Sequence, residues 1–130
     1  MVKLVKLWLP VLVWAGIIFY FSSLADLKTE LKYDFFLRKI AHVVEYLILT
    51  FFLYRAFNGS FRINPRRLFM YVTGLALLYA ASDELHQRFV AGRNCSFGDV
   101  LIDSIGVFLF YAWIKFKQRR PGCWKNWISG

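Results

Sequence analysis

The sequence predicts an all-α integral membrane protein: a four-transmembrane-helix bundle with short loops and with both termini in the cytoplasm. Of its 130 residues, 58% are hydrophobic and 20% are aromatic, and the mean hydropathy is +0.45. A soluble domain of this size cannot bury that much apolar surface. The chain also holds successive apolar runs of about 20 residues, the length that crosses a bilayer. We therefore expect residues 1–130 to form a single membrane domain, with spans near 7–24, 40–57, 68–85 and 100–116.

The first predicted span, 7–24, follows two lysines and ends in Ser22 and Ser23. Pro10 lies near its expected start, where a missing backbone N–H is best tolerated. Small residues after an apolar run are also typical of a cleaved signal peptide. The aromatic content of this run and the spans that follow it favour an uncleaved helix.

The second predicted span, 40–57, follows a segment of mixed charge at 26–39. That segment predicts a connector at the membrane surface, or a short interfacial helix. His42 and Glu45 lie near the start of the second span. Its end runs into Asn58-Gly59-Ser60, which are residues typical of a turn.

The third predicted span, 68–85, begins after a second turn signal at Asn64-Pro65. It is apolar for most of its length and becomes polar at Asp83 and Glu84. An ionisable residue inside a span is costly and marks a candidate functional site.

The fourth predicted span, 100–116, follows a tight turn around Gly92. Ser96 or Asp99 is suited to cap the start of its helix. Asp103 interrupts the apolar run within the first turn, and a group of basic residues closes it.

The basic residues predict the orientation. If the N-terminus is cytoplasmic, the inner side holds more of the 17 basic residues than the outer side, as the positive-inside rule requires. Basic flanks also account for the net charge of +9, so we expect no nucleic-acid partner. Cys95 would then lie outside and Cys123 inside, so these cysteines should not pair. The inner residues are Lys3, Lys6, Arg55, Arg62, Arg66, Arg67, Lys115, Lys117, Arg119, Arg120 and Lys125, and the outer ones are Lys28, Lys32, Arg38, Lys39, Arg88 and Arg93.

All 8 acidic residues and both histidines fall on the predicted outer half. Acidic residues have little weight in setting topology, so their segregation needs another cause. Helical periodicity groups the polar residues of three spans on one face each. The groups are Lys39, His42, Glu45 and Tyr46; Asp83, His86 and Gln87 with Glu84 at the margin; and Asp99, Asp103, Gly106 and Phe110.

These three faces can satisfy their charges only if they point inward, because lipid offers no partner. Gly106 would allow a neighbouring helix to approach closely. Each part also has a structural interpretation: His42 and Glu45 as a hydrogen-bonded pair, Asp83 as a helix end in water, Asp99 as favourable charge in a first turn, and Arg93 as a surface arginine. The coincidence of three helices at one depth favours a functional pocket.

The residue types allow more than one chemistry. His42 and His86, oriented by Asp83 or Glu84, are candidates for general acid–base catalysis. Two histidines and several carboxylates could instead hold a divalent metal, but the chain has no HExxH motif and no cysteine ligand cluster. No cofactor is required by the sequence, and the metal content stays open.

A basic side could grip a phosphate or a carboxylate, through Arg93, Lys39 and the N-terminus of the fourth helix. Ser82, next to Asp83, is the only candidate nucleophile, and a weak one.

Several of these residues together resemble the VanZ-like family of bacterial membrane proteins, which is named for a teicoplanin-resistance protein. The resemblance runs from about Trp14 to Trp113 and has small departures at Ala91, where the family usually has proline, and at Leu24. Its motifs are Phe21-Ser22-Ser23, Lys39-x-x-His42-x-x-Glu45-Tyr46, and Asp83-Glu84-x-His86-Gln87-x-Phe89-x-x-Gly92-Arg93-x-x-Ser96-x-x-Asp99-Val100, followed by Asp103 and Gly106.

The resemblance implies a multi-pass protein of the bacterial cytoplasmic (inner) membrane, with some relatives linked to teicoplanin susceptibility. It supplies no reaction. We expect membrane lipids as partners, together with a lipid-linked cell-wall precursor or a lipoglycopeptide. The first hypothesis is an outer-leaflet pocket that binds a lipid headgroup or such a precursor through Lys39, Glu45, Tyr46, Gln87, Arg93, Ser96, Asp99 and Asp103.

The alternative is a membrane-embedded enzyme that acts on a (phospho)lipid headgroup, with His42, Asp83, Glu84 and His86 as catalytic residues. A third hypothesis, translocation of a lipid or solute along the polar faces, is weaker. Its path would need polar residues in the inner half, where only Thr50 and Thr73 are found.

Overall fold

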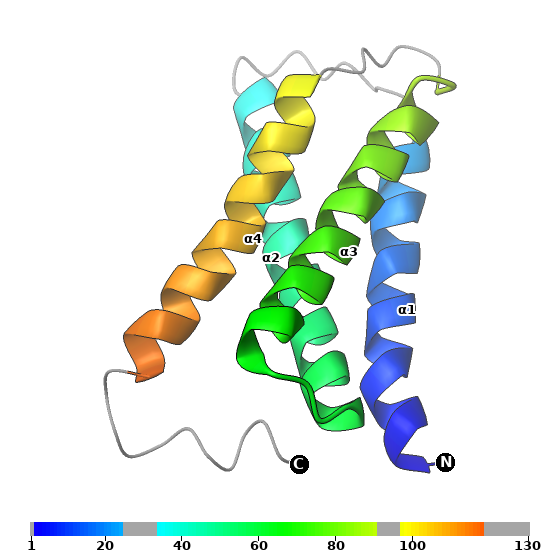
Figure 1. Ribbon diagram of the computed structural model, residues 1–130. Helices are drawn as coiled ribbons and strands as arrows, with labels where there is room; N and C mark the ends of the chain where they lie inside the picture. The colour runs from blue at the N-terminus through cyan, green and yellow to red at the C-terminus, as the bar shows by residue number, and fades with distance from the viewer. Residues whose placement is uncertain (1, 25–33, 91–96, 119–130) are drawn as a thin grey trace.

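The computed structural model describes residues 2–24, 34–90 and 97–118, and its regular structure is entirely helical (Figure 1). The all-α prediction is therefore confirmed. The helices are α1 (Val2–Ser23), α2 (Asp34–Ser60), α3 (Pro65–Gln87) and α4 (Phe97–Gln118).

Three of these helices are long and apolar enough to cross a membrane: Val2–Ser23, Phe36–Ser60 and Pro65–Gln87. The fourth predicted span lies within α4, whose described part does not meet the same criterion. Asp99 and Asp103 near its start and two lysines in its last turn lower its apolar character. Large apolar side chains such as Leu12, Leu78 and Leu101 are 67–68% exposed, which suits a surface covered by lipid.

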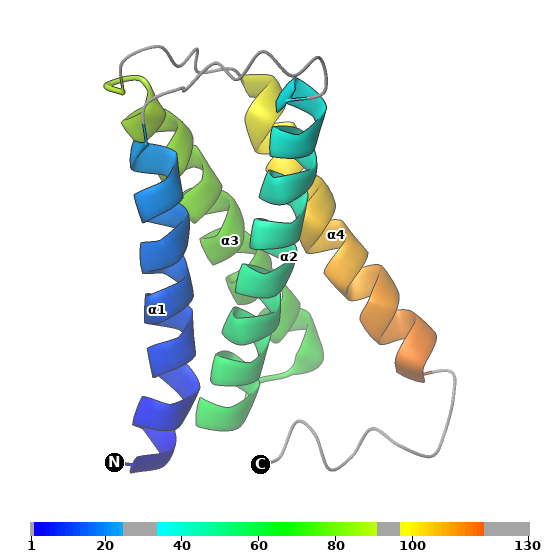
Figure 2. The ribbon, with the colours of Figure 1, turned by 180° about the vertical axis from the view of Figure 1, so that it is seen from behind.

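Helices α2 and α3 each pack against all three other helices, and the most extensive packing is that of α2 on α4. In the described part of the chain, α1 and α4 do not contact each other. The C-terminal end of α4 diverges from the other helices in both views (Figures 1 and 2). The C-terminal ends of α1 and α3 lie at the same end of the molecule as the N-terminal ends of α2 and α4.

The apolar core lies along α2, with Tyr46, Leu49, Val72 and Val107 each at most 2% exposed. These side chains come from α2, α3 and α4, so the core is formed by helix faces brought together in space. Ile18 of α1 is also buried.

Among the hydrogen bonds that attach α1 to its neighbours, three have an aromatic side chain as donor. Trp14 Nε1 donates to the Glu45 carbonyl at 3.0 Å, and the Tyr79 hydroxyl donates to the Ala15 carbonyl at 2.6 Å. Trp8 Nε1 donates to Ser60 Oγ at 3.0 Å. Where water is absent, such bonds fix the rotation and height of a helix, because the alternative is an unsatisfied polar group.

The structure corrects the expected ends of the first two helices. Helix α1 begins at Val2, so Pro10 lies in its interior and not near its start. Helix α2 begins at Asp34, so the segment 34–39 is its first turns and not a separate connector. Residues 25–33 lie outside the described part of the chain.

The turn expected at 58–60 is also wrong, because α2 continues to Ser60. Leu7 packs on Gly59, where an added Cβ would lie 2.8 Å from Leu7 Cδ1, and Trp8 binds Ser60. These contacts with α1 stabilise a last turn for which local sequence predicts a break. The second turn signal agrees with the structure: Asn64 caps α3 by accepting from the Arg66 N–H at 3.0 Å.

Gly106 is the point of closest approach between α2 and α4. A Cβ at this position would overlap the Val43 carbonyl oxygen and would lie 2.9 Å from the Leu47 nitrogen. Both are backbone atoms of α2, so they cannot rotate away as a side chain can. Only glycine therefore permits this helix packing.

We predict that Gly106→Ala lowers the free energy of unfolding by about 1–3 kcal/mol, the usual cost of overpacking. The measurement is unfolding of the purified protein in detergent. Gly74→Ala is the matched control: this glycine is also in a helix, but a Cβ there would meet nothing within 4 Å. The control should raise stability by about 0.5–1 kcal/mol, and equal effects of the two variants would contradict the packing.

Candidate functional site

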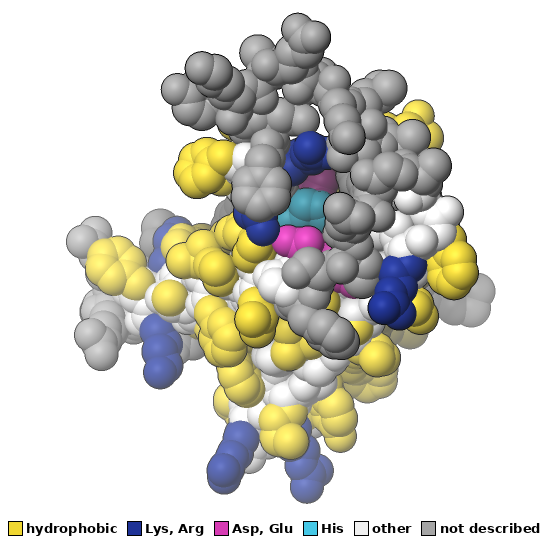
Figure 3. Space-filling view, turned by 90° about the horizontal axis from the view of Figure 1, so that it is seen from above, with side chains coloured by type: hydrophobic (Ala, Val, Ile, Leu, Met, Phe, Trp, Pro, Cys, Tyr) yellow, Lys and Arg dark blue, Asp and Glu magenta, His cyan; other side chains and the backbone are white. Residues whose placement is uncertain are grey.

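The acidic residues of the described chain occupy one half of the helix assembly, which we call the polar half. It comprises the C-terminal parts of α1 and α3 and the N-terminal parts of α2 and α4. Viewed down this end, acidic, basic and histidine side chains gather near the centre (Figure 3). The acidic residues are Asp34, Glu45, Asp83, Glu84, Asp99 and Asp103.

Two ion pairs join α2 to α4 in the polar half. Lys39 Nζ donates to Asp99 Oδ1 at 3.0 Å, and both side chains are about one-third exposed, at 31% and 32%. One turn deeper, His42 Nδ1 lies 3.2 Å from Asp103 Oδ1, with side-chain exposures of 21% and 1%. The deeper pair is at ion-pair distance but lacks hydrogen-bond alignment.

Asp83 of α3 and Tyr46 of α2 complete the buried part of the site, which we call the inner cluster: His42, Tyr46, Asp83 and Asp103. Asp83 is 3% exposed and Tyr46 is fully buried. The Asp83 carboxylate lies close enough to the other three side chains for Coulombic interaction. The inner cluster thus joins three helices.

The inner cluster leaves several polar atoms without a hydrogen bond. These atoms are Asp83 Oδ1, both carboxylate oxygens of Asp103, His42 Nδ1 and the Tyr46 hydroxyl, all of them buried, although His42 Nδ1 and Asp103 Oδ1 are in ion contact with each other. Buried side-chain oxygens in native proteins almost always have a partner, and a lost partner costs about 1–3 kcal/mol, more for a charge. The cluster is therefore chemically incomplete within the described part of the chain.

Ser22 is a site residue for which the sequence analysis assigned no role. It is 3% exposed and accepts from Gln87 Nε2 at 2.9 Å, and the same amide donates to Asp83 Oδ2 at 3.0 Å. This chain of bonds from α1 to α3 holds the Asp83 carboxylate in place. Its only sequence signal is a polar Ser-Ser pair at the end of an apolar helix.

The expected placement of His86 beside Asp83 is wrong. His86 Nε2 lies 3.0 Å from Ser23 Oγ, and its ring packs on Phe19 with centroids 4.4 Å apart. It therefore faces α1 near the surface, whereas Glu84, which was expected at the margin of the polar face, is 4% exposed. The buried side of α3 is therefore rotated away from the face that periodicity predicted, because α3 packs against α1, α2 and α4 together.

The remaining site residues are placed as follows. Glu45 is partly buried, and its carbonyl accepts from Trp14. Ser82 is exposed and donates to the Tyr79 carbonyl of its own helix at 2.7 Å, so it is not paired with a histidine as a nucleophile would be. Arg93 and Ser96 lie outside the described residues. Asp99 is inside the first turn of α4 and does not cap it.

The geometry supports two kinds of chemistry. The Lys39 ammonium at the rim can bind an anion. His42, with a carboxylate beside one ring nitrogen, can transfer protons through the other. Asp103 is the carboxylate next to His42, a position for which the sequence favoured Asp83 or Glu84. Among the described residues, no group of three His, Cys, Asp or Glu side chains is arranged to hold a metal ion.

Comparison with known proteins identifies relatives of the chain. The model of the VanZ/LLP1 family matches residues 7–118. The chain is also 31% identical over 110 residues to the uncharacterized membrane protein YwnJ of Bacillus subtilis (strain 168), covering 78% of this chain and 71% of that protein. No solved structure matches.

We predict that His42→Ala destabilises the protein by about 3 kcal/mol, because it leaves the Asp103 charge buried and unpaired. Lys39→Ala should cost at most about 1 kcal/mol, since its ion pair is partly exposed. Denaturant titration in detergent measures both values. Arg62→Ala, at an exposed position in the opposite half, is the control and should be neutral. Equal losses of unfolding free energy in His42→Ala and Lys39→Ala would show that the buried pair contributes no more stability than the exposed pair.

Proposed function

The chain belongs to the VanZ/LLP1 family and is a membrane protein, and from this premise we propose that its polar half binds a lipid headgroup or a lipid-linked cell-wall precursor at the outer leaflet. The observation that carries the proposal is the pair of cross-helix ion contacts, Lys39–Asp99 and His42–Asp103. Their charged side chains extend from the partly exposed Lys39–Asp99 pair at the rim to the His42–Asp103 pair, which lies deeper. A site of this kind suits a ligand with a polar head and an apolar body.

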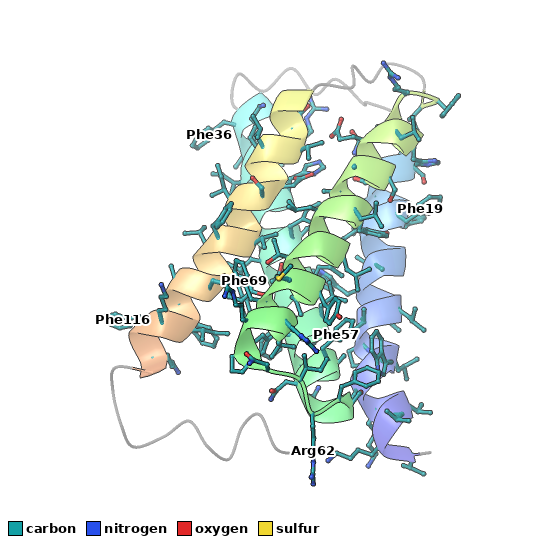
Figure 4. All side chains as sticks on the ribbon, viewed as in Figure 1. Phe19, Phe36, Phe57, Arg62, Phe69 and Phe116 are labelled. Atoms are coloured by element: carbon teal, nitrogen blue, oxygen red, sulfur yellow. The ribbon has the colours of Figure 1, made fainter. Side chains whose placement is uncertain are left out.

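The proposed orientation places four spans in the bacterial cytoplasmic membrane, with both termini in the cytoplasm. The charges support it: basic residues dominate the half opposite the acids, and Arg62 extends from that end (Figure 4). Phe36 and Phe116 point outward from the helices, as side chains in contact with lipid would (Figure 4). In this orientation the polar half faces the outer leaflet, where wall precursors and lipoglycopeptides meet the membrane.

The proposed binding residues divide by depth. Lys39 and Asp99 form the rim, and Arg93 and Ser96, which are also proposed as binding residues, lie outside the described residues. The deeper proposed residues are Glu45, Tyr46, Gln87 and Asp103, which come from α2, α3 and α4. Lysine and arginine side chains suit a phosphate group. Through this site we also propose a link to teicoplanin-type lipoglycopeptide susceptibility.

An enzyme that acts on a (phospho)lipid headgroup is the second candidate function, and the His42–Asp103 contact favours it. A carboxylate beside one ring nitrogen orients the imidazole and stabilises its protonated form. His42 would then be the general base and Asp103 its positioning residue, with Asp83 and Glu84 nearby. His86 is less suited to this role because its partner is Ser23. Turnover of a phospholipid or polyprenyl phosphate by the purified protein, lost in His42→Gln, would establish this function over simple binding.

The orientation predicts the labelling of the two native cysteines. A variant that keeps only Cys95 should react with a membrane-impermeant maleimide on cells whose wall has been removed. A variant that keeps only Cys123 should react only after the membrane is permeabilised. The opposite pattern, or labelling of both from outside, would contradict the proposed topology.

The binding proposal predicts that Lys39→Gln lowers the affinity for an anionic lipid about tenfold, because one charge-assisted contact to phosphate is lost. Native mass spectrometry of the protein with phosphatidylglycerol or a polyprenyl phosphate measures the occupancy. Arg62→Gln removes a basic residue from the opposite half and is the matched control. If both variants retain lipid as the wild type does, or if the wild type retains none, the polar half is not the binding site.

A further inference from the structure

We propose that the inner cluster is a subsite for a primary ammonium group, so that the headgroup bound by the polar half is an amine-bearing phosphate headgroup. The inference rests on the proposed function and names the class of ligand. It starts from the incomplete hydrogen bonding of Tyr46, Asp83 and Asp103.

The unpaired atoms define the chemistry of the missing partner. Three of them are carboxylate oxygens, which only accept hydrogen bonds when ionised, and one is the Tyr46 hydroxyl, which can donate or accept. The remaining atom, His42 Nδ1, faces only one of these oxygens, Asp103 Oδ1, at 3.2 Å. A group that satisfies them must therefore supply several donors from one place. A primary ammonium carries three N–H donors on one atom and fits this requirement.

The charge of the buried layer indicates a cation. The buried ionisable side chains of the described part of the chain are Asp83, Glu84 and Asp103, all acidic. Two basic side chains pair with acids here: His42 approaches one oxygen of Asp103, and Lys39 bonds to Asp99 at the rim. Asp83 and Asp103 together carry more negative charge than the one adjacent imidazole can offset, and buried charge is costly, so binding of a cation would stabilise the folded site.

Tyr46, Asp83 and Asp103 are buried, and His42 is the partly exposed member of the inner cluster, on the side that the proposed function requires. His42 keeps 21% of its side chain exposed, and histidine and acidic side chains are visible from the polar end (Figure 3). The rim cation Lys39 lies three residues before His42 on α2, about 4.5 Å along the helix axis. A headgroup such as phosphoethanolamine could then place its phosphate at Lys39 and its ammonium, after a two-carbon spacer, against Asp103 and Asp83.

The experiment compares phosphatidylethanolamine with phosphatidylglycerol. Both phospholipids carry a charged phosphate, and only phosphatidylethanolamine carries an amine. The full chain is reconstituted in nanodiscs of an equimolar mixture, and retained lipids are counted by native mass spectrometry. We expect phosphatidylethanolamine to be enriched about tenfold over phosphatidylglycerol, the effect of one hydrogen-bonded charge pair. Competition by ethanolamine, which has no phosphate, would support the ammonium subsite and show that a free amine can occupy it.

Two variants test the residues. Asp103→Asn and Tyr46→Phe should each abolish the enrichment, while lipid retention through the rim persists. Ser104→Ala is the matched control on α4, because its hydroxyl bonds to the Leu101 carbonyl of its own helix at 2.6 Å, and it should keep the enrichment. Helical content, measured by circular dichroism, shows whether each variant is folded. If Asp103→Asn does not fold, Tyr46→Phe alone tests the assignment to the inner cluster.

The failures are distinguishable. Equal retention of the two lipids by the wild type, together with loss of both in Lys39→Gln, would overturn the ammonium subsite and leave the binding proposal intact. Retention of no lipid would overturn both. Enrichment that survives in Asp103→Asn and in Tyr46→Phe would place the amine elsewhere and overturn the assignment to the inner cluster.

Discussion

The close packing of α2 on α4 at Gly106 is the contact on which the rest of the site depends. Because no Cβ separates Gly106 from the α2 backbone near Val43, the two helices approach to backbone contact. The ion pairs Lys39–Asp99 and His42–Asp103 lie above this point at successive turns. A larger residue at the contact would move the helices apart and would lengthen both pairs together.

The site changes in character with depth. At the rim, a lysine and an aspartate share a partly exposed bond, which contributes little stability and leaves both groups accessible. Below it, Asp83, Asp103 and Tyr46 are buried and have unpaired atoms. In a membrane protein such groups are costly, so a ligand that binds there gains affinity from satisfying them. This gradient is the basis of our proposal that an anion binds at the rim and a cation binds at the inner cluster.

Helix α1 supports the site without supplying a charge to it. Its Trp14 and its Ala15 carbonyl bond to α2 and α3, which fixes how far the three helices rotate relative to one another. Ser22 then reaches Gln87, and Gln87 holds Asp83. The motifs that resemble the VanZ-like family thus include a supporting residue, Ser22, besides the residues of the two ion pairs.

The order of the helices along the chain and the polar faces of α2 and α4 were determined by the sequence, because the α-helical repeat alone sets which side chains align. The stripes of Lys39, His42 and Tyr46 and of Asp99 and Asp103 follow from it. Tertiary structure decided what periodicity cannot: the continuation of α2 to Ser60 against α1, the turning of His86 toward Ser23, the burial of Glu84, and the choice of Asp103 as partner of His42. Each depends on how one helix is rotated and shifted against another, and that is set by contacts between distant residues.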